Sequence, residues 1–285
     1  MSLATTCGLL AWCVAFGAPP SAKNDAKLAA ALIDAHNKER AKADLPAFTA
    51  DEKLIAAALV HAKDMAEHGR MTHEGSDGSN AAQRIERQGY AFTTAAENVA
   101  EGARMVAEVM KIWMDSPPHR QNILGSYEQI GYAVARDEDG KPYWCVNFAS
   151  PWPKLDPDKA AAEVVSALNK ARAEAGKPPL EVNPKLTGVA VEEAKRLAKS
   201  EGTTAANDDP KAFLARLRAS GYRYRTLGRT AGLRQPTAAA VVKAWLDGPE
   251  QTQVVFGSFS DVGVGYALSE AGIPYWFLIL ARPSQ

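Results

Sequence analysis

Residues 113–133, WMDSPPHRQNILGSYEQIGYA, are the most informative stretch of this chain. A tryptophan is followed by a Ser-Pro-Pro-His-Arg turn, and the segment ends in an Ile-Gly-Tyr-Ala run typical of a strand. Residues 245–265 keep the tryptophan, the aspartate and the glycine in the same register, because Trp113 lies 132 residues before Trp245. The segment therefore occurs twice, and the repeat can be followed outward from it.

The same offset of 132 residues relates the two halves of the chain without a gap. Chance does not keep a Gly-Tyr pair, a Pro-Tyr-Trp triplet and two tryptophans in one register, so the chain is a tandem duplication. The Pro-rich stretch 150–159 disfavours both helix and strand and is interpreted as the linker. Matched pairs include Asn37 with Asn169, Arg40 with Arg172, Gly89–Tyr90 with Gly221–Tyr222, Gly131 with Gly263, and Pro142–Trp144 with Pro274–Trp276.

The division of the chain follows from this repeat. We expect a signal-like segment at residues 1–22, a first domain at 25–152 and a second domain at 160–285. A length of 285 residues and a hydrophobic content of 46% suffice for two cores. The formal net charge is zero, which favours no particular partner and disfavours nucleic acid.

Periodicity and capping signals predict the same order of elements in each copy. Helices followed by a hairpin, with one further strand, predict the α/β (α+β) class, a sandwich with a mainly antiparallel sheet. In the first copy we expect helices over 27–43, from Asp51 to Glu67 with Gly69 closing it, over 80–88 and over 104–115, and strands near 91–99, over 129–135 and over 142–149.

Four motifs resemble one family. They are His36–Arg40 (HNKER), Met71–His73 (MTH), Ala96–Ala100 (AENVA) and Trp113–Leu124 (WMDSPPHRQNIL). Together they are similar to the bacterial form of the CAP superfamily, that is, the cysteine-rich secretory, antigen 5 and pathogenesis-related or SCP-like proteins. The resemblance is strong over residues 30–150 and reaches 160–285 through the repeat. It implies two tandem α/β/α sandwiches.

The resemblance also implies a cavity lined by two histidines and two acidic residues, which holds a divalent metal such as zinc in some relatives. The matching residues here are His73, His119 and Glu97. The second acidic position falls at Ser116, and only the neighbouring Asp115 is placed to substitute for it. Asn98, within the third motif, completes the expected cavity.

Three uses of this cavity remain open at the level of sequence. His73, His119 and Glu97 supply the ligand types of a zinc site, and Glu97 can instead orient one imidazole without binding the metal itself. Without metal, the same three residues suit proton transfer, with Glu97 as the candidate catalytic base. The alternative is a structural pair that ties a loop to the core.

All five histidines lie in the first copy. At the offset of 132, His73 becomes Ala205, Glu97 becomes Arg229 and His119 becomes Gln251. The second copy keeps the fold-bearing residues and loses every expected ligand, which favours a role for the first site beyond folding. His61, Asp64 and His68 share one helix face, which is interpreted as a solvated face.

Three functions follow as hypotheses. The first is an exported binding module whose first-domain cavity holds a divalent metal or a small ligand, with the second domain as scaffold; binding is favoured over catalysis. The second is a metal-assisted hydrolase acting on peptide or envelope material. The third is a structural envelope or interaction protein.

The terminal and basic segments add two expectations. Residues 7–18 form a short apolar run typical of a secretory signal, which predicts a secreted, periplasmic or extracellular protein; a lipid anchor at Cys13 is the alternative. With Cys7 and Cys13 in that run, Cys145 is expected to be a buried apolar filler. An anionic partner is a further hypothesis, resting on Arg216, Arg218, Arg223, Arg225, Arg229 and Arg234.

Overall fold

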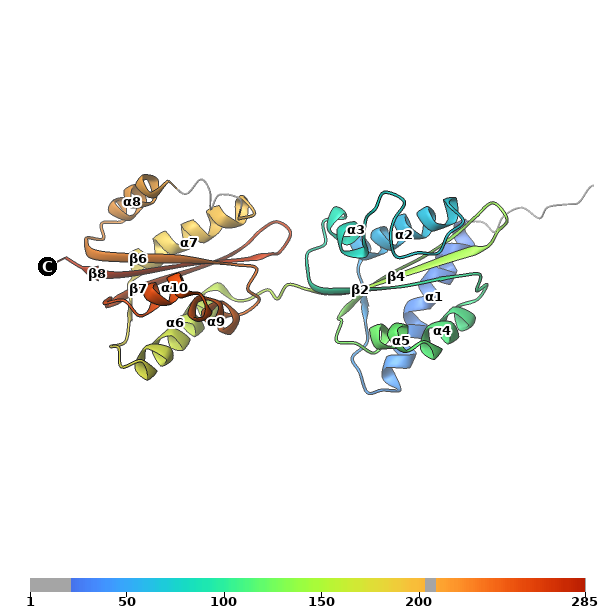
Figure 1. The fold of residues 1–285 in the computed structure, drawn as a ribbon, viewed down its shortest axis with the longest axis horizontal. Helices are drawn as coiled ribbons and strands as arrows, with labels where there is room; N and C mark the ends of the chain where they lie inside the picture. Colours follow the sequence, from blue (N-terminus) through green and yellow to red (C-terminus); the bar gives the residue numbers. More distant parts are fainter. Residues whose placement is uncertain (1–21, 203–208, 285) are drawn as a thin grey trace, which may run out of the picture.

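The computed structural model describes residues 22–202 and 209–284. These residues form two copies of one arrangement, each with a four-stranded sheet between two layers of helices (Figure 1). The expected signal-like segment falls on residues 1–21, outside the described part of the chain, apart from Ala22. No described helix has the length and apolar character needed to cross a membrane.

The first copy has its sheet in the order β1-β3-β4-β2. Its strands are antiparallel except for β1, which pairs with β3 in parallel. The expectation of a mainly antiparallel sheet is therefore confirmed. The elements are α1 (Ala22–Ala41), β1 (Thr49–Ala50), α2 (Glu52–Glu67), α3 (Ala81–Arg87), β2 (Phe92–Glu101), α4 (Val106–Asp115), α5 (Pro117–Ile123), β3 (Gln129–Arg136) and β4 (Pro142–Pro151).

The second copy repeats this topology, with its sheet in the order β5-β7-β8-β6. Strand β5 is the parallel one, and it pairs with β7. The elements are α6 (Pro157–Glu174), β5 (Glu181–Val182), α7 (Pro184–Lys199), α8 (Pro210–Ala219), β6 (Tyr224–Leu233), α9 (Ala238–Asp247), α10 (Pro249–Val255), β7 (Asp261–Leu268) and β8 (Pro274–Pro283).

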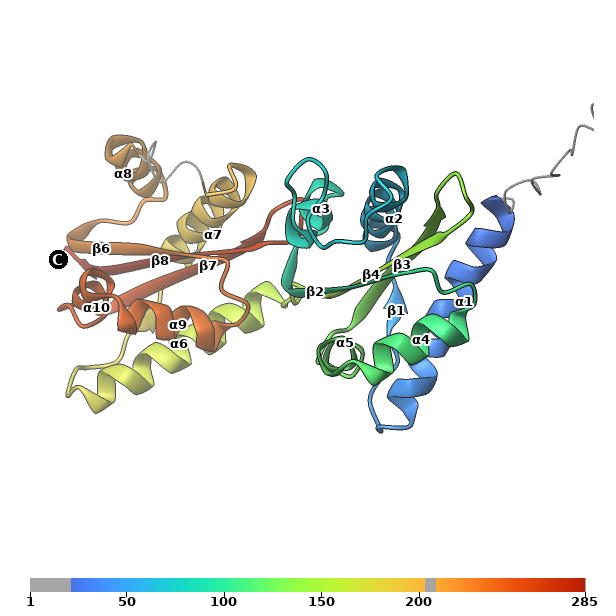
Figure 2. The same cartoon turned by 45° about the vertical axis from the view of Figure 1, so that its right-hand side comes forward.

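The layers are clear when the molecule is turned (Figure 2). In the first copy, α2 and α3 cover one face of the sheet, and α1, α4 and α5 cover the other. Helices α7 and α8 correspond to the first pair, and α6, α9 and α10 to the second group. Each copy is thus the α/β/α sandwich that the resemblance implies.

Local signals place the helix ends. The Asp51 carboxylate accepts hydrogen bonds from the backbone N–H groups of Lys53 (2.9 Å) and Leu54 (3.2 Å), which caps α2. Past the end of the same helix, Gly69 has φ of 61°, a left-handed conformation that glycine adopts without strain. The predicted start and stop of this helix are both confirmed.

The sequence did not predict the helix α5 or the two-residue strand β1, and it placed the ends of the first helix and of the linker differently. The short helix α5 begins at Pro117, where the sequence predicted only the end of α4. Proline suits the first turn of a helix because the missing N–H has no intrahelical partner there. The predicted linker at 150–159 is also too long, since β4 runs to Pro151 and α6 begins at Pro157, again with proline at the helix start.

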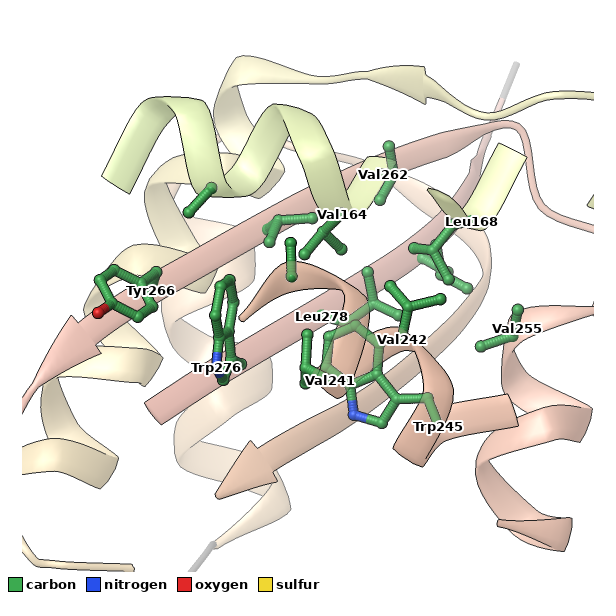
Figure 3. Packing of buried hydrophobic residues seen from close by; sticks show 14 of the residues in the cluster. Val164, Leu168, Val241, Val242, Trp245, Val255, Val262, Tyr266, Trp276 and Leu278 are labelled. Atoms are coloured by element: carbon green, nitrogen blue, oxygen red, sulfur yellow. The ribbon is translucent and has the colours of Figure 1, made fainter. Parts of the chain in front are cut away.

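In each copy, tryptophans fill the core on one side of the sheet. That side is covered by α1, α4 and α5 in the first copy and by α6, α9 and α10 in the second. Trp113, Trp144, Trp245 and Trp276 are all buried, and Figure 3 shows the last two among the aliphatic side chains of the second copy. Their indole N–H groups donate to backbone carbonyls; for example, Trp113 Nε1 lies 3.1 Å from the Val99 oxygen, and Trp245 Nε1 lies 2.8 Å from the Ala231 oxygen. The repeated tryptophans are therefore structural.

The repeated arginine is structural as well. Buried Arg40 donates to the carbonyl oxygens of Pro46 (2.6 Å), Ile123 (2.9 Å) and Gly125 (2.8 Å), which fixes the end of α5 against α1. Arg172 makes the matched contacts in the second copy, with Pro178, Val255 and Gly257. A buried guanidinium with several acceptors is costly to replace, which accounts for its presence in both copies.

Candidate functional site

The centre of the site is Glu97, a buried carboxylate on β2. Its side chain is 3% exposed and faces the helix layer formed by α2 and α3. His73 Nδ1 donates to Glu97 Oε1 at 2.9 Å, and Arg84 Nη2 donates to Glu97 Oε2 at 2.7 Å. Each oxygen of the carboxylate therefore has a charged or polar donor, as a buried ion requires.

Arg84, on α3, also holds the loop that carries His73. Its guanidinium donates to the carbonyl oxygens of Ser79 (2.6 Å) and His73 (3.0 Å). One buried arginine thus fixes both the Glu97 carboxylate and the backbone at His73. The His73 ring remains 62% exposed, so its second nitrogen, Nε2, is available to solvent or a ligand.

The pKa values of Glu97 and His73 shift in opposite directions. Burial by itself raises the pKa of Glu97, but the hydrogen bond from His73 and the charge of Arg84 outweigh it and lower that pKa overall. The hydrogen bond to Glu97 raises the pKa of His73, against the smaller effect of burial. The pair therefore favours an ionised Glu97 beside an imidazole that gains a proton more readily than a free one.

His119 approaches from the other side, on α5. Asn98 Nδ2, from β2, donates to the His119 carbonyl at 3.1 Å, and Asn122 Nδ2 donates to Asn98 Oδ1 at 2.8 Å. Burial lowers the pKa of His119, and the charge of His73 lowers it further. The structure thus brings His73, Glu97, Asn98 and His119 together, with one imidazole inclined to be charged and the other neutral.

His61 belongs to the same group, and the interpretation of its helix face as solvated was wrong. The ring is fully buried, its Nε2 donates to the Thr72 carbonyl at 2.7 Å, and that atom lies 3.9 Å from Glu97 Oε1. Burial lowers the pKa of His61, and the charge of Glu97 acts against it without reversing the shift. Of the three residues assigned to that face, Asp64 is half-buried, and only His68, further along the helix, is exposed.

Two further residues of the expected cavity, Asp115 and Ser116, make contacts within α4 and α5. The Asp115 carboxylate is 65% exposed and pairs with Lys111 on the same face of α4. Ser116 lies at the junction of α4 and α5, where its carbonyl accepts the Arg120 N–H at 2.9 Å. Both contacts are local to these two helices.

The arrangement of His73, Glu97 and His119 tests whether the site could hold the metal that the resemblance implies. Tetrahedral zinc takes four protein ligands in structural sites and three, with a water, in catalytic ones. Both Glu97 oxygens already accept hydrogen bonds, and the pairing with His73 is the arrangement of a carboxylate that orients an imidazole rather than binding a metal itself. Within 22–202 and 209–284, no group of three His, Cys, Asp or Glu residues is placed to hold a metal ion. The set therefore fits a resident zinc poorly.

Cys145, on β4, is fully buried and free, as expected. Its Sγ lies 3.4 Å from Glu97 Oε2, and burial raises the pKa of the thiol well above its ordinary value. The thiol is therefore a neutral neighbour of the carboxylate. Sequence reasoning missed Arg84, His61 and Asn122 as parts of the site; of these, Arg84 had a signal, because the offset of 132 places Arg216 at the matched position.

The second copy has different chemistry at the matched positions. Arg229 occupies the strand position of Glu97, and Gln251 occupies the helix position of His119. Ala205, the counterpart of His73, lies outside the described residues. Of the basic residues expected to face an anionic partner, Arg218, Arg223, Arg225 and Arg234 are exposed, whereas Arg216 and Arg229 are partly buried.

Parts of this chain are similar in sequence to known proteins. The curated relatives include the uncharacterized protein YkwD of Bacillus subtilis, 32% identical over 101 residues, which are 35% of this chain and 39% of that protein. The uncharacterized membrane protein YlbC of the same organism is 27% identical over 122 residues, 42% of this chain and 34% of its own length. The chain thus spans well under half the length of both relatives.

A solved structure and a family model also match. An extracellular protein containing an SCP domain from Bacillus anthracis aligns with a TM-score of 0.43 and 22% identity, over 47% of this chain and 45% of its own. The family model described as "CAP: Cysteine-rich secretory protein family" matches residues 33–148 and again residues 165–280. The chain belongs to the cysteine-rich secretory protein (CAP) family and carries its domain twice.

Proposed function

We propose that this chain is an exported CAP protein that acts as a binding module, with the ligand site in the first copy and the second copy as a scaffold for it. The ligand is a small polar molecule held by the outward Nε2 of His73 and by His119. The observation that carries the proposal is the Arg84–Glu97–His73 chain of contacts, which fixes an exposed imidazole on a buried ion pair. An imidazole that served only to brace the loop would not need to present its second nitrogen to solvent.

The charge state of the two imidazoles favours an anionic ligand group over a divalent metal. His73 donates from Nδ1 to Glu97, so its Nε2 is a donor when the ring is protonated and an acceptor when it is neutral. The raised pKa of His73 increases the protonated fraction near neutral pH. A carboxylate or phosphate group on the ligand would then accept from His73, beside the neutral His119.

The opposite pH dependence of the two ligand types gives a sharp test. An anion bound by protonated His73 should be lost as pH rises through the raised pKa, above the ordinary value of 6.5, whereas a metal bound by neutral imidazole should be gained over the same range. Residues 22–285 would be titrated with acetate, inorganic phosphate and zinc from pH 5.5 to 8.5. Calorimetry would give affinities, and NMR would follow the histidine ring signals.

The variants are His73→Ala, His119→Ala and both together, with His68→Ala as the matched control. His68 is an exposed imidazole at the end of α2 that bonds only to its own helix. Loss of anion binding in the site variants, with His68→Ala unchanged, supports the proposal. One zinc per chain, lost in the double variant, would establish the metal alternative instead. Hydrolysis of peptide or envelope material by the zinc-loaded protein would then favour a hydrolase, and no binding of any kind would leave a structural role.

Export is the second part of the proposal. It rests on the apolar run at residues 7–18 and on the secretory description of the family to which both copies belong. Cell fractionation of the native host would locate the chain, and mass spectrometry of its N-terminus would show whether the run is cleaved. An uncleaved chain confined to the cytoplasm would refute export.

A further inference from the structure

A cleft lies at the junction of the two copies and is lined by both of them. Its volume is about 670 Å³, within the range of about 300–1,000 Å³ that is typical of small-molecule sites. One wall comes from the first copy and the linker after β4, and the other from the hairpin between β7 and β8, which reaches toward the first copy (Figure 2). We call it the junction cleft, and its chemistry comes from Tyr90, Glu128, Gln129, Trp152, Lys154 and Glu270.

The junction cleft is separate from the histidine site, since no histidine lines it. Its residues are also not repeated at the free end of the second copy. At the offset of 132, Trp152 corresponds to Ser284, and Glu128 corresponds to Ser260. The cleft is thus a product of the way the two copies meet, and it carries an aromatic ring and a carboxylate that the matching free end lacks.

Trp152 gives the junction cleft an aromatic face. It is half-buried, whereas the four tryptophans of the two cores are buried. Its side chain packs against the cluster that contains Ile273 and Tyr275, and it also lines the cleft. The four buried indoles each donate to a backbone carbonyl, but the Trp152 indole makes no hydrogen bond within residues 22–202 and 209–284. It therefore offers both an apolar face and an unused N–H donor.

Tyr90 and Gln129 form a fixed polar pair in the junction cleft. The Tyr90 hydroxyl donates to Gln129 Oε1, which leaves the two N–H bonds of the Gln129 carboxamide for a ligand. Burial raises the pKa of Tyr90, and the charges of Asp51 and Glu128 raise it further, so the hydroxyl stays protonated and remains a donor. Both carboxylates therefore lie near this pair, and both line the cleft.

Three charged side chains of the junction cleft have no partner of their own. Glu128 belongs to the first copy, Lys154 to the linker and Glu270 to the hairpin between β7 and β8. None of these side chains makes a hydrogen bond or an ion pair in the part of the chain that the structure describes. Carboxylates only accept hydrogen bonds, and an ammonium group only donates them. With Asp51 and Lys53 included, the cleft has three carboxylates and two ammonium groups, a net charge of −1.

We propose that the junction cleft binds a saccharide, with a sugar ring stacked on the Trp152 indole. A sugar hydroxyl both donates and accepts, so it suits a cleft that holds free carboxylates beside free N–H donors. The C–H face of a sugar ring is apolar and gains from covering an aromatic ring. An anion would be repelled by the excess of carboxylates, and an organic cation would leave the ammonium group of Lys154 without a partner. This site is independent of the proposed ligand site at His73.

The test is protection of Trp152 from acrylamide, a neutral quencher of tryptophan fluorescence. The full chain would carry Trp12→Phe, so that Trp152 is the one remaining tryptophan that is not buried. It would be titrated with cellobiose, maltose and N,N′-diacetylchitobiose, and with choline as an organic cation. We expect at least one disaccharide to reduce the quenching in a saturable manner. Protection by none of the three disaccharides, or by choline alone, would overturn the proposal.

Matched variants test whether both copies hold the ligand. Glu270→Gln removes a carboxylate from the junction cleft, and Glu138→Gln removes its counterpart from the free hairpin between β3 and β4. We expect Glu270→Gln and Glu128→Gln each to weaken disaccharide binding about 10-fold, and Glu138→Gln to change it less than about twofold. All three residues are exposed, so the variants should fold, which circular dichroism checks. Equal effects of Glu270→Gln and Glu138→Gln would contradict the inference.

The aromatic face has a variant of its own. Trp152→Leu keeps an apolar contact with the second copy but removes the ring, so calorimetry replaces fluorescence as the readout. We expect this variant to weaken disaccharide binding about 10-fold. Unchanged binding by folded Trp152→Leu would show that no sugar ring covers the indole and would overturn the stacking.

Discussion

His36 shows how a single buried residue couples the first copy to pH. The ring is fully buried, with centroids 5.7 Å from Trp113 and 5.6 Å from Phe148, and its Nδ1 donates to the Leu32 carbonyl at 2.7 Å. Its Nε2 is buried without a partner among the described residues. Burial lowers the pKa of His36 from 6.5 to about 4, so the folded state holds this ring neutral.

The sign of the resulting pH dependence follows from linkage. Above pH 6.5, His36 is neutral in both states, and its contribution to stability is constant. Between pH 6.5 and about 4 the unfolded chain binds a proton that the folded chain does not, so stability falls with pH. The loss is on the order of 3 kcal/mol across that window. His61 and His119, whose pKa values are also lowered, act in the same direction.

The second copy has a different residue at the position that corresponds to His36. Its residue at this position is Leu168, fully buried, and the copy contains no histidine. We predict that His36→Leu makes the first copy lose less stability between pH 6.5 and 4, by on the order of 3 kcal/mol. Urea unfolding of the wild type and of His36→Leu at a series of pH values from about 4 to 7 measures the difference. Parallel pH curves for the wild type and His36→Leu would refute the account.

At the scale of elements, two glycines set how closely a helix approaches its sheet. A Cβ atom on Gly131, in β3, would lie 2.0 Å from the backbone carbonyl carbon of Leu54 in α2. Gly263, its counterpart in β7, has the same relation to Leu186 in α7, at 2.3 Å. At both positions an added Cβ atom would collide with backbone atoms of the facing helix, so only glycine fits. This is the physical reason that the sequence repeat retains both residues.

Gly131→Ala should therefore force α2 away from the sheet and destabilise the first copy by about 1–3 kcal/mol or more. Gly188→Ala is the contrasting change. Gly188 lies inside α7, where an added methyl group would meet no heavy atom within 4 Å beyond the backbone of its own helix, and its counterpart in the first copy is already Ala56. That variant should stabilise the second copy by about 1 kcal/mol. Urea unfolding of both variants measures the two effects, and a neutral Gly131→Ala would contradict the close approach.

At the scale of the whole molecule, three of the residues through which the two copies meet differ from their counterparts in the repeat. Ile273 and Tyr275, from the β7–β8 hairpin and β8, are buried in a cluster with Ala91 and Trp152 of the first copy packed against it. The matched hairpin of the first copy has Lys141 in place of Ile273, paired with Glu101 at 3.0 Å. The counterparts of Ala91 and Trp152 in the second copy are Arg223 and Ser284. Apolar residues thus occur on the joined ends and polar residues at the free ends.

We predict that this contact couples the unfolding of the two copies. Ile273→Lys introduces the residue of the free hairpin and should remove about 2 kcal/mol of apolar contact. Calorimetry should then show two unfolding transitions where the wild type shows one. Lys141→Ala, on the free hairpin, should leave the coupling unchanged. A wild type that already unfolds in two separate steps would show that the copies are independent.

Much of the fold was available from the order of residues. The offset of 132 residues revealed the duplication, the carboxylate of Asp51 and the glycine at position 69 predicted the ends of α2, and the Pro-Tyr-Trp triplet predicted β4. These features are readable because capping and strand periodicity depend on residues close together in the chain. The motifs also placed His73, Glu97 and His119 in one site, although their metal chemistry stays a prediction.

The partners of Glu97 were decided only by the tertiary structure. Arg84 and His61 lie on different helices and reach the strand because of the way α2 and α3 pack on the sheet. His119 was known from its motif, but its position depends on α5, a helix that begins at the proline expected to end the preceding one. A buried ion pair is satisfied by whichever donor the packing brings near, and no local pattern in the sequence encodes that choice.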